Sequence, residues 1–310
     1  MNISVFMARL RRDPFDGSPY RGVARVGRGR IAVTYYVVRR SDGRALVVKL
    51  LRRAFAKDAQ SVDRMRLEWE ALRDLSHPHL VSVIDFGVTR DGRPFVVFER
   101  LAGTTVEQEW TRRIISIHEA ATWTRELVSG LGAAHRIKVV HRDVHLGNLF
   151  LERPDVERTG AGRPRLKVLD FGFAKVLEGA RIRAVVPATD QALSVGASRF
   201  MSPEAARGGA LDERSDLYAA GLVLWALLSG HVPYPELAES TEVQLAQATR
   251  ALPLPSTLRP GVPAELDAVV ARALEKSPSR RFASASDFMH ALRRVRLPER
   301  WAYTELFDRQ

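Results

Sequence analysis

The sequence predicts an α+β fold in two lobes, and three observations support this prediction. Strand patterns fill the first hundred residues, where polar and apolar side chains alternate. After Gly103 the pattern becomes helical, with apolar residues three and four apart over residues 117–136. Residues 216–228 are apolar on nearly every side, as a helix in the centre of a core is. We therefore expect a small, mainly antiparallel β lobe with one main helix, and a larger, mainly helical lobe.

The small lobe is expected over about residues 20–99, after an N-terminal arm of residues 1–19. Ser41-Asp42-Gly43 has the composition of a hairpin turn, and Asp91-Gly92 is a second turn signal. The expected strands are residues 33–38, 45–51 and 95–98, and the expected helix is about residues 58–75.

A hinge near residues 99–103 is expected to lead into the large lobe, about residues 104–296, and a tail of residues 297–310. The stretch 253–263 contains several prolines and is interpreted as a loop. The expected helices are residues 117–136, 216–228, 241–248, 263–274 and 284–295.

Composition excludes several classes of protein. The 310 residues include no cysteine, which excludes disulfides and thiolate metal sites and fits a cytoplasmic location. No apolar run reaches the ~18 residues that span a bilayer, so we expect no membrane segment. The net charge is +12, but the arginines are scattered along the chain, and we expect no nucleic-acid partner.

Lys49 interrupts an apolar strand pattern, where an ammonium group buried without a partner would be costly. The expected helix over residues 58–75 places Glu68 on the same face as Leu72 and Leu75. The carboxylate of Glu68 is therefore the candidate partner of Lys49. An exposed edge position for both residues stays open.

Two short motifs point to chemistry. His141-Arg142-Asp143-Val144-His145-Leu146-Gly147-Asn148 lies between two apolar segments, and Asp170-Phe171-Gly172 follows a third. Their Asp and Asn side chains offer the hard oxygen ligands that Mg²⁺ prefers.

In their order along the chain, these residues resemble the protein kinase family, and most of all its bacterial Ser/Thr kinases. The resemblance covers about residues 20–295 and implies a two-lobed protein kinase fold. It also implies transfer of the γ-phosphate of Mg-ATP to Ser/Thr hydroxyls of proteins, with autophosphorylation. The matching motifs are Gly27-Arg28-Gly29, Lys49, Glu68, Phe98-Glu99-Arg100-Leu101, His141-Arg142-Asp143, Asn148, Asp170-Phe171-Gly172, Met201-Ser202-Pro203-Glu204, Asp216-Leu217-Tyr218 and Arg281.

The resemblance implies a role for each matching residue. Lys49 would hold the α- and β-phosphates and pair with Glu68. Asp143 would accept the proton of the substrate hydroxyl, and Asn148 and Asp170 would hold magnesium. The nucleotide would lie against Gly27, Gly29, Ala32, Thr34, Val47, Phe98, Glu99, Leu101 and Phe150. The remaining matches would have structural roles. Glu204 would form an ion pair with Arg281, and Asp216 would support the catalytic loop around residues 141–148.

The sequence departs from the family pattern around the nucleotide. Ala32 replaces the third loop glycine and resists a positive φ, so the phosphate loop is expected to be stiffer or shifted. Thr34 replaces the valine that follows. Val47 and Phe150 are larger than the usual alanine and leucine, which predicts a narrow adenine pocket and weaker ATP binding.

A second group of departures concerns the acceptor. His145 stands where Ser/Thr kinases have lysine, and Ala197 stands where they have threonine. His145 could still reach the γ-phosphate, with a charge that depends on pH. The loop also resembles that of small-molecule phosphotransferases such as aminoglycoside and choline kinases, whereas the large-lobe motifs favour a protein substrate. A pseudokinase and a small-molecule kinase stay open as alternatives.

The activation segment would run from Asp170 to Glu204. Thr189 and Ser194 are its candidate phosphosites, and a phosphate there could pair with Arg142. A polar loop with incidental hydroxyls is the equal alternative.

Overall fold

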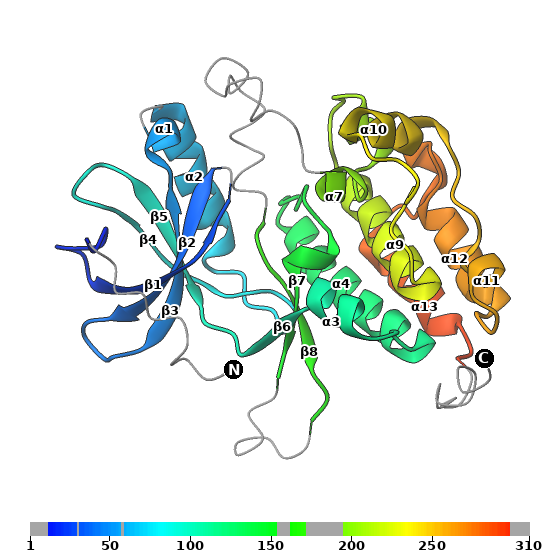
Figure 1. Cartoon of the computed structure of the whole chain (residues 1–310), viewed down its shortest axis with the longest axis horizontal. Coiled ribbons are helices and arrows are strands. Elements are labelled where there is room, and N and C mark those ends of the chain that lie inside the picture. Colours follow the sequence, from blue (N-terminus) through cyan, green and yellow to red (C-terminus); the bar gives the residue numbers. More distant parts are fainter. Residues whose placement is uncertain (1–11, 30, 57–58, 154–161, 172–194, 298–310) are drawn as a thin grey trace. The chain divides into compact units, whose positions relative to one another are not determined.

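The computed structural model describes residues 12–29, 31–56, 59–153, 162–171 and 195–297. The chain forms two compact units, the first extending to Ala102 and the second beginning at Gly103 (Figure 1). Thr189, Ser194 and residues 298–310 of the predicted tail lie outside the described residues. Within the described ranges, no helix is both long and apolar enough to cross a membrane.

The first unit is built on a five-stranded antiparallel sheet, coloured blue to cyan in Figure 1. Gly43, with a φ of 71°, and Gly92, with a φ of 78°, supply the left-handed residues of the two predicted turns. In spatial order the strands are β1 (Tyr20–Arg28), β2 (Ala32–Arg39), β3 (Ala45–Leu51), β5 (Pro94–Glu99) and β4 (Val83–Val88).

One face of this sheet holds the core of the first unit. Leu46, Val48 and Leu50 of β3 point into it and are fully buried. Phe15, from the predicted arm, packs edge-on against Tyr35 with ring centroids 5.4 Å apart. The sequence interpretation did not single out Phe15, because an isolated aromatic residue before the first strand has no periodic pattern around it.

Two helices accompany the sheet, α1 (Arg53–Ala56) and α2 (Ala59–Leu72). Trp69 of α2 packs against Phe86 of β4, with ring centroids 5.7 Å apart. Phe86 pairs with Val96, and Val96 pairs with Lys49, so the three residues share one face of the sheet. Helix α2 therefore covers the face that Lys49 presents, opposite the core around Phe15.

The second unit is mainly helical and is organised around α9 (Glu213–Ser229). Residues 215–229 of α9 are all buried, as its uniformly apolar sequence predicts. Helix α4 (Ile117–Arg136) packs against it and begins at a capping box between Ser116 and Glu119. The other helices are α3 (Val106–Arg112), α7 (Val195–Ser198), α8 (Pro203–Ala206), α10 (Ser240–Thr249), α11 (Pro255–Leu258), α12 (Ala264–Ala273) and α13 (Ala285–Arg294), with one-turn 3-10 helices η2 (Leu146–Asn148) and η5 (Pro278–Arg280).

A small antiparallel sheet completes the second unit, with β7 (Leu149–Glu152) between β6 (Gly103–Thr105) and β8 (Arg165–Val168). Gly103 has a φ of 152°, and a Cβ on it would lie 2.0 Å from the carbonyl oxygen of Leu151. Only glycine fits this close approach of two strands.

The α+β fold class with a β-rich first part and a helical second part is confirmed. The interpretation of residues 253–263 as a loop was wrong in one place, because α11 forms a helical turn there. Pro255 starts that turn, and its fixed φ suits the first position of a helix.

Candidate functional site

Several of the residues predicted to bind nucleotide in the first unit share one face of the sheet. Residues directly opposite each other in an antiparallel pair point to the same face. Lys49 lies opposite Thr34 and Val96, and Val47 lies opposite Phe98. Ala32 begins β2 opposite Leu51, and Gly27 pairs with Thr34. The strand register thus brings Ala32, Thr34, Val47, Lys49 and Phe98 together on the face that α2 covers. Glu99 lies opposite Leu46 and belongs to the other face.

The turn that connects β1 to β2 is closed by a hydrogen bond. The backbone N–H of Gly29 donates to the carbonyl oxygen of Ala32 over 2.9 Å. Ala32 has ordinary strand geometry without a positive φ, and the expectation that the loop is stiffer or shifted stays a prediction. An L side chain fits a strand without strain.

At the end of β5, two hydrogen bonds join Glu99 to Ser82, the residue directly before β4. Its carboxylate accepts a hydrogen bond from the backbone N–H of Ser82 over 2.8 Å, and its own N–H donates to the Ser82 carbonyl. Phe98 is buried and Leu101 is half-buried. Glu68 lies in α2, but its side chain is outside the described atoms, so its pairing with Lys49 stays a prediction.

In the second unit, Asp216 of α9 holds the start of the catalytic loop (residues 141–148) through hydrogen bonds to its backbone. Its carboxylate accepts from the backbone N–H groups of His141, over 2.7 Å, and Arg142, over 2.8 Å. It also bonds to Nε2 of His135 over 2.8 Å. Arg142 has a φ of 66°, an unfavourable conformation for a non-glycine residue. The buried carboxylate fixes the loop in this conformation, as predicted for Asp216.

His141 connects the loop to the residues before Asp170. Its Nε2 lies 2.7 Å from the carbonyl oxygen of Leu169, which can only accept, so Nε2 holds the proton. Its Nδ1 accepts the backbone N–H of Asp143 over 3.2 Å. Burial lowers the pKa of His141, although nearby Asp216 acts in the opposite direction. His141 is therefore a neutral structural link.

Asn148 and Asp170 have the donor chemistry for a divalent cation. The Asn148 amide nitrogen donates to the backbone oxygen of Asp143 over 2.8 Å and to its Oδ2 over 3.2 Å. The amide oxygen is thus directed away from these acceptors. The N–H of Leu169 donates to the Asn148 carbonyl over 2.8 Å, which places Asp170 beside the loop. An amide oxygen and a carboxylate are suitable ligands for such an ion.

His145 is the N-terminal cap of η2. Its Nδ1 accepts the backbone N–H of Gly147 over 3.1 Å. Its Nε2 lies 3.8 Å from Oδ2 of Asp143. The ring therefore lies between the loop backbone and the predicted catalytic carboxylate.

The predicted ion pair between Glu204 and Arg281 is present. Two guanidinium nitrogens of Arg281 donate to the two carboxylate oxygens of Glu204 over 2.8 and 2.7 Å. The other N–H groups donate to backbone carbonyls, and the Arg281 side chain is fully buried. Hydrogen bonds from Arg281 and Ser215 outweigh burial and lower the pKa of Glu204 to about 2.

Comparison with known proteins agrees with this geometry. A family model described as the protein kinase domain matches residues 20–307. The chain belongs to the protein kinase domain family. ATP and a divalent metal are therefore the ligands that the family implies.

Serine/threonine-protein kinase Pkn1 of Myxococcus xanthus is 34% identical over 285 residues, covering 91% of this chain and 39% of its own length. PknK of Mycobacterium bovis is 33% identical, covering 89% of this chain and 23% of its own length. The PknI kinase domain of Mycobacterium tuberculosis superposes with a TM-score of 0.67 at 24% identity, over 91% of this chain and 98% of that domain. The predicted resemblance to bacterial Ser/Thr kinases is confirmed. The chain spans well under two thirds of the length of these curated relatives.

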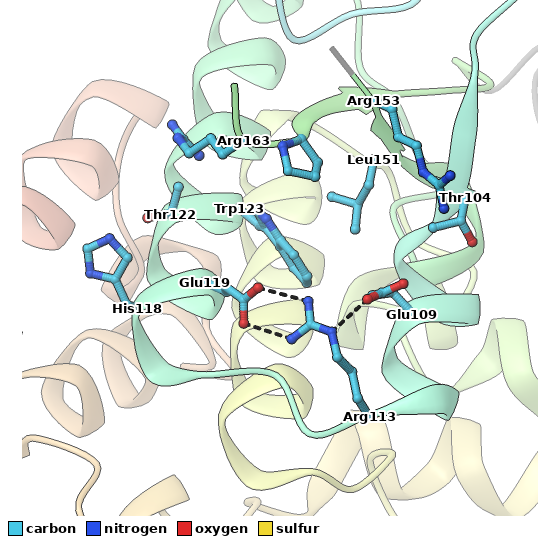
Figure 2. Close-up of a pocket in the computed structure, with 11 residues that line it drawn as sticks. Thr104, Glu109, Arg113, His118, Glu119, Thr122, Trp123, Leu151, Arg153 and Arg163 are labelled. Carbon is cyan, nitrogen blue, oxygen red and sulfur yellow. Dashed lines mark hydrogen bonds and ion pairs between the residues drawn. The ribbon is translucent and has the colours of Figure 1, made fainter. Parts of the chain in front are cut away.

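The second unit of this kinase chain also has a cavity of about 290 Å³, lined by residues that the sequence interpretation did not select (Figure 2). Arg113 reaches into it and donates to Glu119 over 2.9 and 2.8 Å and to Glu109 over 2.6 Å. The side chains of Trp123 and Leu151 form apolar lining. Glu109 and Glu119 lie four and six residues from Arg113 and on two helices, so helical spacing alone could not have revealed the three-way cluster.

Proposed function

We propose that this chain is a kinase domain that transfers the γ-phosphate of Mg-ATP to Ser or Thr hydroxyls of proteins, itself included. The observation that best supports the proposal is the arrangement of the catalytic loop. The loop of Asp143 and Asn148 is held by N–H groups that donate to the Asp216 carboxylate, and hydrogen bonds of His141 and Leu169 join it to the segment that leads into Asp170.

Asp143 is the group that receives the proton. The substrate hydroxyl oxygen forms a bond to the γ-phosphorus, the bond from that phosphorus to the β–γ bridging oxygen breaks, and ADP leaves. The proton of the hydroxyl passes to the Asp143 carboxylate. The hydrogen bond from the Asn148 amide to Oδ2 helps to fix the direction in which this carboxylate points.

Charge neutralisation is the other requirement of phosphoryl transfer. Asn148 and Asp170 would hold Mg²⁺, which when bound neutralises charge on the phosphates. Lys49 would supply a second cation to the α- and β-phosphates, with Glu68 as its partner. Gly27, Gly29, Ala32 and Thr34 would lie along the phosphates. Val47, Phe98, Glu99, Leu101 and Phe150 would surround adenine.

Labelled ATP and Mg²⁺ test the proposal with purified protein and a generic acceptor protein. We expect label on Ser or Thr, and we expect the Asp143→Ala variant to remove it. Circular dichroism of both proteins controls for folding, and mass spectrometry locates the modified residues. A folded wild-type protein that labels neither itself nor the acceptor would contradict the proposal.

One observation favours a second candidate function. His145 in place of lysine, with the order of residues in the loop, is similar to small-molecule phosphotransferases. Label transferred to an amino-alcohol or aminoglycoside, but to no protein, would support that function. A pseudokinase would bind nucleotide and transfer no label to either class of acceptor.

A further inference from the structure

His145 lies where the family has lysine, and the structure suggests a role that is not that of a cation. Its Nδ1 accepts the backbone N–H of Gly147 over 3.1 Å. A ring nitrogen that accepts such a bond has no proton of its own, so a neutral ring has its proton on Nε2. That nitrogen lies 3.8 Å from Oδ2 of Asp143.

The space around Gly147 restricts the ring. A Cβ at this position would lie 3.0 Å from Cε1 and 3.1 Å from Nδ1 of His145. It would also lie 3.1 Å from a carboxylate oxygen of Glu107 in α3. The ring therefore packs directly over a residue without a side chain, and its backbone hydrogen bond fixes its tilt.

The Asp143 oxygen that faces His145 already accepts another hydrogen bond. The Asn148 amide donates to Oδ2 over 3.2 Å and to the Asp143 carbonyl over 2.8 Å. A separation of 3.8 Å from His145 is too long for a hydrogen bond. Catalytic hydrogen bonds are often long before substrate binds and shorten in the reacting complex.

We propose that His145 is a positioning residue that acts as a neutral donor: its Nε2–H directs the Asp143 carboxylate, while its Nδ1 is held by the Gly147 N–H. This inference rests on the proposed kinase function and extends it. It differs from the expectation that His145 reaches the γ-phosphate with a charge that depends on pH.

Two substitutions at His145 distinguish the acceptor role of Nδ1 from the donor role of Nε2. Asparagine places an amide near the position of Nδ1, so His145→Asn keeps an acceptor for Gly147 and loses the donor toward Asp143. Glutamine reaches the position of Nε2, so His145→Gln keeps the donor and loses the cap. We expect kcat to fall about 10- to 100-fold in His145→Asn, because a misdirected catalytic group costs rates of this size. We expect His145→Gln to recover most of that loss, with the KM for ATP unchanged in both.

His118→Asn is the matched control, because His118 is exposed on α4 and lines the separate cavity around Arg113. It should leave kcat and KM unchanged. Gly147→Ala retains His145 but puts a methyl group against its ring, and we expect it to lower kcat like His145→Asn.

A spectroscopic measurement tests the same inference without turnover. In ¹⁵N NMR of the full chain at neutral pH, with His145 assigned from the His145→Gln spectrum, we expect a protonated Nε2 and an unprotonated Nδ1. A protonated Nδ1, or a His145→Asn variant with the kcat of the wild type, would overturn the inference. A wild type that transfers no phosphate would instead overturn the proposed function, and the tautomer would still be decided by NMR.

Discussion

The catalytic loop of the second unit and the lysine-bearing sheet face of the first unit are held in place by different kinds of interaction. In the loop, side chains hold the backbone: the Asp216 carboxylate accepts two N–H groups that lie 75 and 74 residues away in sequence. On the sheet face, the backbone positions the side chains, since strand pairing sets the register of Lys49 and Val47.

This difference explains the departures from the family pattern on the sheet face, whereas His145 is a departure within the loop itself. Strand pairing places any side chain of suitable size, so Thr34 and Val47 can replace other residues without changing the sheet. The loop depends on particular acceptors, and Asp216, His141 and Asn148 match the family motif. Substitutions in the loop should therefore affect turnover and folding together, whereas substitutions on the sheet face should affect nucleotide affinity.

The largest effect is expected from Asp216→Ala. Two buried N–H groups and the His135 ring would lose their acceptor, at a cost of about 2–5 kcal/mol in the free energy of unfolding. Arg142 would leave its positive-φ conformation, and we expect kcat to fall by at least about 100-fold. Thermal unfolding and steady-state kinetics measure the two effects, and a variant with normal turnover would show that the loop does not depend on this brace.

The next largest effect is a loss of stability when the Glu204–Arg281 ion pair is broken. Arg281→Met leaves a partly buried carboxylate without its cation, which costs about 3–5 kcal/mol. In a double-mutant cycle with Glu204→Gln, we expect the two losses to be strongly non-additive, because each change removes the same interaction. Urea unfolding measures them, and simple additivity would contradict the expectation.

The Glu204–Arg281 pair also makes the free energy of unfolding depend on pH. The pKa of Glu204 is about 2 in the folded chain, below the ordinary value of 4.5. Protons therefore bind more readily to the unfolded chain, and the contribution of the pair is complete above about pH 4.5 and is lost as the pH falls toward 2. The stability gap between wild type and Glu204→Gln should shrink over this range. A difference in the free energy of unfolding that grew as the pH fell would contradict this prediction.

A smaller effect is expected from two residues proposed to surround adenine, Val47 on the sheet face of the first unit and Phe150 in β7 of the second. Val47→Ala and Phe150→Leu should each tighten ATP binding by about 3- to 10-fold, or about 1 kcal/mol, because each removes bulk from the proposed adenine site. Isothermal titration with an unhydrolysed ATP analogue measures the change. A wild type that already binds tightly, and does not respond to either substitution, would rule out the narrow pocket.

The smallest effect is expected from Arg113→Met in the separate cavity. The side chain of Arg113 is 41% exposed, so solvent screens its ion pairs and their loss should cost only about 0.5–1 kcal/mol. Turnover should not change, because the side-chain ion pairs of Arg113 among the described residues are with Glu109 and Glu119, which lie outside the loop and the proposed ATP site. A large fall in kcat would show that this cavity is coupled to catalysis.

Regular patterns made much of the fold predictable from the sequence. The helix over residues 117–136 was predicted from its apolar spacing with the bounds of α4, and the structure adds a capping box at Ser116. Asp216 and the Glu204–Arg281 pair were predictable only from the family resemblance, since residues 77 positions apart have no local signal. The cap that His145 forms on Gly147, and the burial of Phe15, depend on packing that no sequence pattern specifies.

The dependence of the initial phosphorylation rate on ATP concentration, measured in wild type, Val47→Ala and Phe150→Leu, distinguishes the two regions most directly. An intact catalytic loop with an altered nucleotide face should give turnover that depends on Asp143, a high KM for ATP, and a KM that falls in both variants while kcat stays constant. Tight ATP binding without turnover would contradict this division of roles, because the loop would then be the defective region and the sheet face the intact one.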